Sequence, residues 1–145
     1  MILYEAMIPL NPKTKKNHQE IRFRQFRGQG FYKKTKFGFK YVGIPFVAQG
    51  KAYEQYERDA GWFLKKPSKP IDIPVQVKCI FYRDSKRRCD LTNLLEAIDD
   101  ILVHYGILAD DNFSIIYSHD GSRVFVDKEN PRTEIVIEDI RSYNL

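Results

Sequence analysis

The chain has 145 residues, a net charge of +5, and hydrophobic and aromatic contents of 43% and 14%. This composition suits one domain with a buried core and excludes a disordered chain. No apolar run approaches the roughly 20 residues that span a bilayer, and the N-terminal apolar residues precede the lysines, the reverse of a signal peptide. We therefore expect a single domain over residues 1–145 in a soluble, cytoplasmic protein.

The charges are unevenly distributed along the chain. From Lys13 to Lys40 there are ten Lys or Arg residues and one acid, whereas from Asp84 to Asp111 there are seven acids and three basic residues. A basic segment suits a polyanion such as nucleic acid, and an acidic segment suits a divalent cation. Two ordinary solvated faces would explain the same distribution, so both readings stay open at this point.

The first half of the chain predicts strands followed by a helix. Residues 2–8 read as a strand closed by prolines, and residues 20–26 alternate imperfectly, as a half-exposed strand does. The glycine- and lysine-rich segment over 28–45 is typical of a hairpin or a flexible loop. After Pro45, aromatic and small residues at spacings of three and four predict an amphipathic helix that ends near Lys65-Lys66.

The second half contains the clearest elements. Residues 75–83 alternate as a strand, and the apolar stripe that begins at Leu91 predicts a helix with Asp90 at its N-cap and Gly106 as its left-handed stop. Residues 113–124 and 132–140 read as two further strands. We expect an α+β domain with a single mixed sheet of about four to six strands and two main helices.

Asp90 and Asp111 are the candidate metal ligands. Asp90 opens the helix and Asp111 follows it; a helix of about 15 residues spans roughly 22 Å, so the two meet only if the intervening loop folds back along the helix. Two carboxylates and water make an oxygen-rich site that suits Mg²⁺. Each residue also has an ordinary structural explanation, because Asp is a favoured N-cap and "ADDN" is common turn composition.

Basic residues that could contact phosphates lie in two places. One group directly precedes Asp90 and the other follows the first strand. The candidate nucleic-acid-binding residues are Lys86, Arg87, Arg88, Lys15, Lys16 and Asn17. The aromatics Tyr32, Phe37 and Phe39 could stack on bases, although aromatic residues more often belong to a core.

The stretch "RRCDLTNLLEAIDDILVHYGILADDNFSI" resembles the RusA family of Holliday junction resolvases, which is common in prophages and related elements. It is similar to the family pattern of basic residues, D-L-D-N-L, an acidic helix and a D-D pair. The resemblance implies a RusA-like fold and a homodimer that cuts four-way DNA junctions symmetrically with Mg²⁺, for which Mn²⁺ can substitute. It assigns metal-binding aspartates to Asp90 and Asp111, with Asp110 beside them and with Asn93 and Asp100 in matching positions.

Two positions depart from the pattern. Thr92 stands where the family has a second aspartate, and Glu96 stands where it has a catalytic lysine. Four residues apart on a helix, the two share a face, so we expect Glu96 to supply the missing carboxylate near a metal site that includes Thr92.

The favoured function is therefore a Mg²⁺-dependent endodeoxyribonuclease that resolves branched DNA in recombination and repair, with Asp90, Asp111 and Glu96 as catalytic residues. A catalytically weakened junction-binding protein and an RNA-binding protein remain alternatives.

Overall fold

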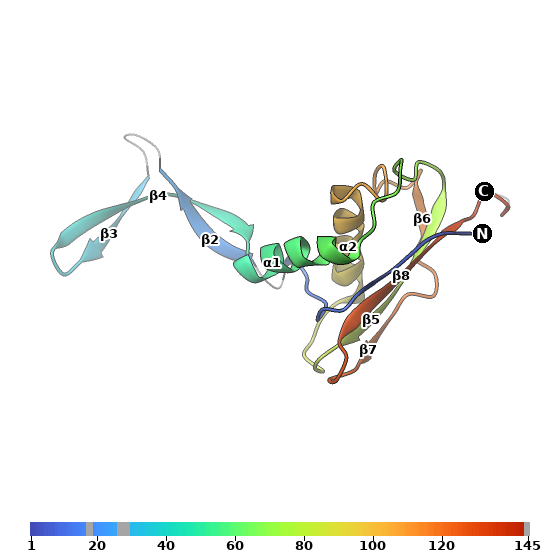
Figure 1. Ribbon diagram of the computed structural model, residues 1–145. Helices are drawn as coiled ribbons and strands as arrows, with labels where there is room; N and C mark the ends of the chain where they lie inside the picture. Colours follow the sequence, from blue (N-terminus) through green and yellow to red (C-terminus); the bar gives the residue numbers. More distant parts are fainter. Residues whose placement is uncertain (17–18, 26–29, 144–145) are drawn as a thin grey trace.

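The computed structural model describes residues 1–16, 19–25 and 30–143. Within these ranges the chain forms a body with two α-helices and a mixed five-stranded sheet, and an arm that projects from the body as a three-stranded sheet (Figure 1). The expected α+β class with a mixed sheet and two helices is confirmed. The sheet of the arm comes in addition to the single sheet that the sequence predicted.

The central strand of the main sheet is β5 (Val75–Arg83). On one side it pairs antiparallel with β8 (Arg132–Asp139), which pairs antiparallel with β1 (Ile2–Ile8). Alternate residues of β5 are buried, as the sequence pattern predicted. The bounds of β1 and β5 coincide with the predicted strands.

The strand predicted over residues 113–124 is wrong as one element, because it divides into β6 (Ile116–Ser118) and β7 (Arg123–Val126). Both pair parallel with β5, one near each end of it. Between them the chain turns at Gly121, whose φ is +78°. Between β6 and β7, side chains bond the backbone groups of β5 that no strand pairs there. His119 Nδ1 lies 2.8 Å from Val77 O, and the Cys79 N–H donates to Ser122 Oγ at 3.0 Å. The break therefore leaves these groups of β5 paired.

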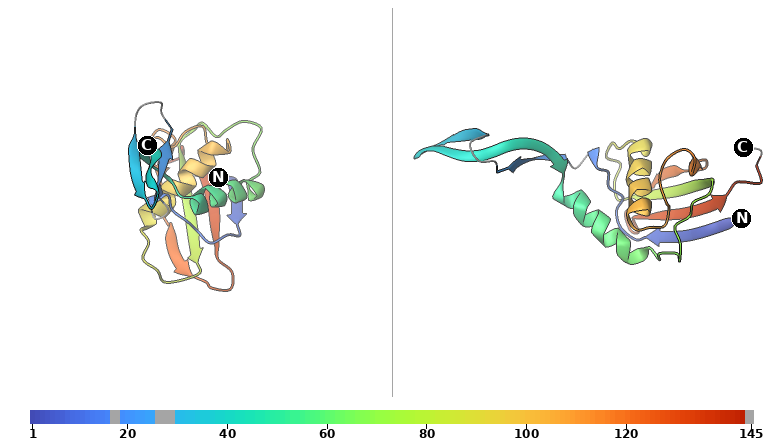
Figure 2. Two further views of the ribbon diagram at one scale, coloured as in Figure 1. Left: turned by 90° about the vertical axis from the view of Figure 1, so that its left-hand side faces the viewer. Right: turned by 90° about the horizontal axis from the view of Figure 1, so that it is seen from above.

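Helix α2 (Leu91–His104) covers one face of the main sheet. Its buried side chains meet the buried side chains of β5 and β8 in one hydrophobic cluster, and Figure 2 shows both helices on the same side of that sheet. Gly106 follows the helix with a φ of +71°, as predicted for its left-handed stop. Among the described residues, no helix is long and apolar enough to cross a membrane.

Helix α1 (Lys51–Ala60) is shorter than the sequence predicted. Residues before Lys51 belong to a strand, and the helix passes at Gly61 into the single 3₁₀ turn η2 (Gly61–Phe63) instead of reaching Lys65-Lys66. The ring of Tyr105 packs so closely on Gly61 that a Cβ there would lie 2.4 Å from it, and the Tyr105 hydroxyl donates to Glu57 O at 2.7 Å. The tyrosine hydroxyl therefore bonds the Glu57 carbonyl, which would accept a backbone N–H if the α-helix continued.

The arm consists of β2 (Gln19–Arg24), β3 (Phe31–Thr35) and β4 (Gly38–Gln49). The long strand β4 pairs antiparallel with both of the others, so the segment predicted as a hairpin or loop is a hairpin. The predicted strand over 20–26 corresponds to β2, and its residue Phe26 lies outside the described residues.

Candidate nucleic-acid and metal site

A basic hollow lies where β5 ends and the chain turns toward α2. It has a volume of about 700 Å³. Its lining comes from two segments and comprises Asn11, Pro12, Lys13, Arg83, Asp84, Ser85, Arg87 and Arg88. The Asp84 N–H donates to Asn11 Oδ1 at 3.0 Å, and the Arg83 guanidinium donates to Arg87 O, so the two segments are held together and the turn is braced. The fold therefore adds Asn11, Lys13 and Arg83 to the predicted basic turn.

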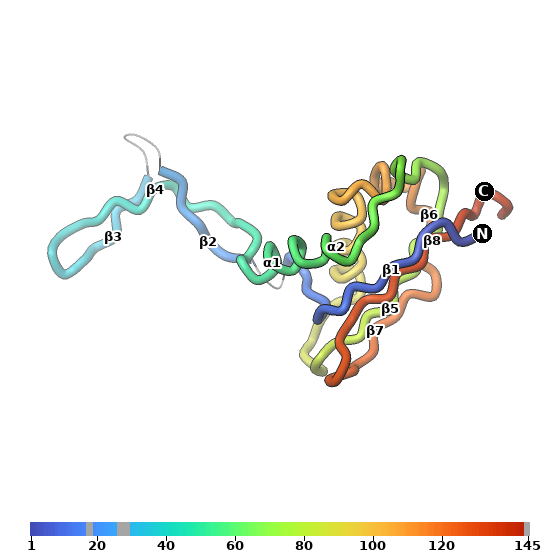
Figure 3. Tube along the Cα trace, in the orientation of Figure 1, coloured from blue at the N-terminus to red at the C-terminus, as the bar shows by residue number. Residues whose placement is uncertain are grey.

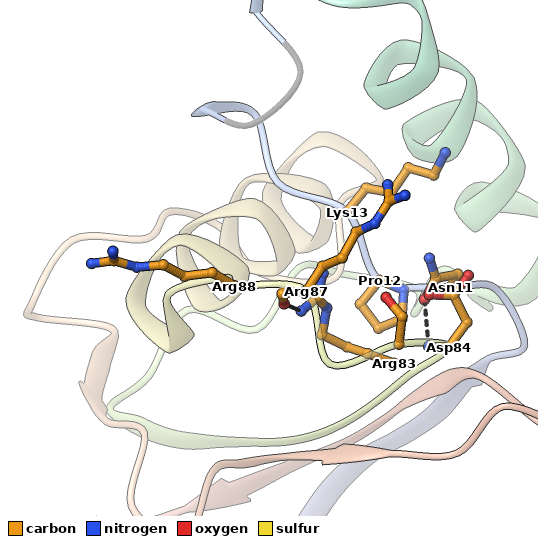
Figure 4. A pocket seen from close by; sticks show the side chains of 8 residues that line it. Asn11, Pro12, Lys13, Arg83, Asp84, Arg87 and Arg88 are labelled. Carbon is orange, nitrogen blue, oxygen red and sulfur yellow. Dashed lines mark hydrogen bonds between the residues drawn. The ribbon is translucent and has the colours of Figure 1, made fainter.

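The arginines of this turn point in different directions. Figure 4 shows the Arg87 side chain running toward the side of Lys13, whereas Arg88 extends away from both. Lys86 is exposed on the same turn. The turn thus presents positive charge on two sides of the entrance to α2, which suits an extended phosphate backbone better than one small anion.

Asp90 stands at the N-cap of α2, as predicted, with its backbone carbonyl accepting the N–H of Asn93 at 3.1 Å. Within the described chain, its carboxylate accepts no capping N–H from the helix backbone; one oxygen lies 3.4 Å from the side-chain nitrogen of Asn93. The exposed carboxylate therefore remains available to a ligand, although the residue has the position of a cap.

After α2 the chain turns at Gly106 and continues beside Ile71. Ile107 N–H donates to Leu102 O at 2.9 Å, and Ala109 N–H donates to Ile71 O at 3.0 Å. The turn that follows is held by Asp110, whose carboxylate accepts the Asp111 N–H and the Asn112 amide, both at 2.7 Å. These bonds, first that of Asn112, lower the pKa of Asp110.

Asp111 lies in an electrostatic neighbourhood of other carboxylates. Partial burial raises its pKa, and the neighbouring carboxyls of Asp110 and Asp100 raise it further. Asp111 and Asp100 in turn raise the pKa of Asp99, after the larger effect of burial. Asp111 therefore interacts electrostatically with carboxyls in the third turn of α2.

Asp90 is at the other end of that helix surface. Ten residues separate Asp90 from Asp100, about 15 Å along a helix axis. Among the described residues, no group of three or more His, Cys, Asp or Glu side chains is arranged to hold a metal ion. The pairing of Asp90 with Asp111 in one metal site therefore stays a prediction.

The remaining predicted residues meet on one face of α2. Thr92, Glu96 and Asp100 follow at intervals of four, which places them in one row. Lys15 forms an ion pair with Asp100, and Lys16 Nζ lies 3.9 Å from Glu96 Oε2. These two lysines are thus attached to the acidic helix, and Asn17 lies outside the described residues.

Sequence reasoning missed a paired histidine beside this face. His119 Nε2 lies 2.9 Å from Asp99 Oδ2. Burial alone would lower the pKa of His119, but the hydrogen bond and the charge of Asp99 outweigh it, so the net shift is upward. The adjacent acids Asp99-Asp100 were visible in the sequence, yet nothing local connects them with a residue twenty positions away.

The donor chemistry of this region fits a hard divalent cation. The carboxylates of Asp90 and Asp111 are exposed, and the pKa of Asp111 is raised first by partial burial and then by neighbouring carboxyls, whose repulsion a cation would relieve. Asp110 has both oxygens engaged in its turn, and Thr92 offers only a neutral hydroxyl.

Comparison with known families gives a match to the model described as endodeoxyribonuclease RusA, over residues 9–138. A comparison with curated proteins gives no match. The matched range runs from the segment that lines the basic hollow, through α2 and the Asp110-Asp111 turn, almost to the end of β8. The chain therefore belongs to the RusA family of endodeoxyribonucleases.

Proposed function

We propose that the protein is a metal-dependent, structure-selective endonuclease that resolves four-way DNA junctions by symmetric cleavage during recombination and repair. The observation that carries the proposal is the order of charges in a member of this nuclease family: the lining of the basic hollow extends to Arg88, two residues before Asp90 begins the helix with the acidic face. A phosphate bound by Arg87 and Lys13 would lie next to carboxylates that hold a cation.

In this proposal the basic turn orients the DNA backbone, and Asp90 and Asp111 hold Mg²⁺ or Mn²⁺. When bound, the cation neutralises charge on the scissile phosphate and lowers the pKa of an attacking water. Glu96 adds a carboxylate on the same helix face as Thr92. Lys15 and Lys16, now paired with α2, are close enough to exchange their carboxylate partners for DNA phosphates.

The decisive experiment is cleavage of a synthetic four-way junction with Mg²⁺, with Mn²⁺ and with EDTA. We expect Asp90→Asn and Asp111→Asn each to lower the cleavage rate roughly a hundredfold or more, a loss of about 2.7 kcal/mol of transition-state stabilisation. Asp59→Asn, which changes a half-buried carboxylate of α1 that is bonded to Gln55, is the matched control and should cut normally. Cleavage that persists in both site variants would contradict the proposed site.

A catalytically weakened junction-binding protein is the second candidate. It is favoured by the neutral Thr92 and by Lys15 and Lys16, which lie near Asp100 and Glu96 where a cation would bind. This candidate predicts salt-sensitive junction binding without product in any metal. Tighter binding to linear single-stranded RNA than to junctions would instead indicate an RNA-binding protein.

A further inference from the structure

The outer end of the arm carries an unusual combination of residues. We define the distal hairpin as residues Phe31–Gly43, which form β3, its turn and the first half of β4. This segment contains four lysines, five aromatic residues and no acid. Figure 3 shows it at the far end of the arm, away from the body.

Four of the five aromatic side chains of the distal hairpin are exposed to solvent rather than packed in a core, and Tyr41 is half-buried. Phe37 at the turn is 95% exposed, Phe39 73% and Tyr32 67%. The cross-strand partners Tyr32 and Tyr41 lie on one face with ring centroids 5.4 Å apart, and Lys34 is directly opposite Phe39. Residues two apart on a strand point to the same face, so Lys34 and Phe39 share the face of Tyr32 and Tyr41. That face therefore carries aromatic rings and a lysine.

Lys33 and Lys40 are directly opposite each other on the other face. Like charges in a cross-strand pair destabilise a hairpin. In the described part of the chain, none of the four lysines forms an ion pair with an acid. A polyanion would remove the repulsion, whereas the equally basic hairpin of a second copy would increase it.

The base of the arm is anchored beside the candidate site. Arg22 of β2 donates to Gln49 O at 2.8 Å and forms ion pairs with Glu20 at 2.7 Å and with Glu54 of α1 at 3.1 Å. The segment leading into β2 is the one whose Lys15 and Lys16 pair with α2. The arm therefore starts at the acidic helix face and reaches outward from it.

We propose that the distal hairpin is a second DNA-binding element, in which the lysines contact phosphates and Tyr32, Phe37 and Phe39 stack on bases that are unstacked at a branch point. The proposal deepens the proposed function, since it assigns recognition of the branched structure to the arm. Base–aromatic stacking is tolerant of sequence, so it suits an enzyme that recognises DNA structure.

The test is fluorescence anisotropy with a labelled four-way junction and a labelled linear duplex, in EDTA so that nothing is cut. We expect the triple variant Tyr32→Ala/Phe37→Ala/Phe39→Ala to bind the junction at least about tenfold more weakly and the duplex only slightly more weakly. Trp62→Ala, which removes an aromatic ring that is 86% exposed on η2, is the matched control and should bind as the wild type does.

A second variant separates DNA contact from folding. Lys33→Gln/Lys40→Gln removes the like-charge pair, so it should raise the thermal stability of the chain or leave it unchanged. Its junction affinity should nevertheless fall at least fivefold, with a shallower dependence on salt. Lys69→Gln/Lys128→Gln, which neutralises two exposed lysines of the body, is the charge control.

Unchanged junction affinity in both hairpin variants would overturn the inference. A change in oligomeric state with unchanged DNA affinity would do the same, because it would make the hairpin a contact between copies. The binding test contains no metal, so its result does not depend on cleavage. Junction binding that depends on the arm, in a protein that does not cut with Mg²⁺ or Mn²⁺, would refute the proposed function alone.

Discussion

In the proposed site, Glu96 is the residue that would replace the second carboxylate of the family pattern. The fold places it in one row with Thr92 and Asp100 on the exposed face of α2. Its contact with Lys16 is long, at 3.9 Å, and both side chains are more than half exposed. Such a pair contributes little to stability, so the carboxylate is free to reorient toward a cation.

We predict that Glu96→Gln lowers metal-dependent junction cleavage at least about tenfold, because the amide keeps the size of the side chain but removes its charge. Cleavage rates at saturating Mg²⁺ measure this effect, with the exposed Glu129→Gln as control. A Glu96→Gln enzyme with the wild-type rate would exclude the carboxylate from the site.

Asp99 and His119 form a half-buried pair next to the proposed site. Both ring nitrogens of His119 are engaged, one with Val77 O and one with Asp99. The pair links α2 to the turn between β6 and β7. Asp99 is also the neighbour whose pKa responds to Asp111, so this link belongs to the same acidic region.

We predict that Asp99→Asn lowers the pKa of His119, since the hydrogen bond and charge that oppose burial are weakened. A histidine NMR titration measures the change, and Asp59→Asn serves as control.

Because the folded pKa of His119 is raised, the stabilisation that it provides is full below its ordinary value of about 6.5 and is lost as pH rises through the folded value. The wild type should therefore exceed His119→Gln in free energy of unfolding by more at pH 5.5 than at pH 8. A difference that does not depend on pH would contradict a charged pair.

At the scale of elements, the turn between β5 and α2 places the basic residues directly before Asp90. Its position follows from two strongly periodic neighbours, a strand of period two and a helix of period 3.6, which the sequence predicted with the observed start of each. The contribution of Lys13 and Asn11 could not be predicted in this way, because they are about seventy residues away along the chain.

We predict that Arg87→Gln weakens junction binding and reduces the slope of log affinity against log salt by about 0.9 if one phosphate contact is lost. Salt titrations of binding in EDTA give this slope. Arg141→Gln is a suitable control, because that arginine is exposed and pairs with Asp139 near the end of β8. An identical slope in both variants would mean that the turn does not contact DNA.

At the scale of the whole molecule, one chain provides one acidic helix face and one arm. Symmetric cleavage of a junction requires two equivalent sites, which a twofold dimer supplies. The arm extends the reach of each chain beyond the body (Figure 1), so two copies would contact a wider region of a junction than two active sites alone.

We predict a homodimer with twice the 17.1 kDa mass of one chain, measured by light scattering after size exclusion, both free and with junction DNA. The Asp90→Asn protein should dimerise equally well, since the proposed metal site does not have to form for assembly. A chain that stays monomeric with and without DNA would contradict symmetric resolution.

The sequence by itself determined the elements whose signals are local. These are the alternating strands β1 and β5, the apolar stripe and the left-handed stop of α2, and the family motif from the basic turn to Asp110-Asp111. Periodicity and turn chemistry act between residues a few positions apart, so a linear pattern reveals them.

Only the tertiary structure decided which charges meet. It placed Asp111 beside Asp100 and Asp99, attached Lys15 and Lys16 to the acidic helix, and paired His119 with Asp99. It also divided one predicted strand into β6 and β7 and placed β2, β3 and β4 in a separate sheet that forms the arm. Each outcome depends on contacts between segments distant in the chain, and such contacts arise from the packing of the whole core rather than from any local pattern.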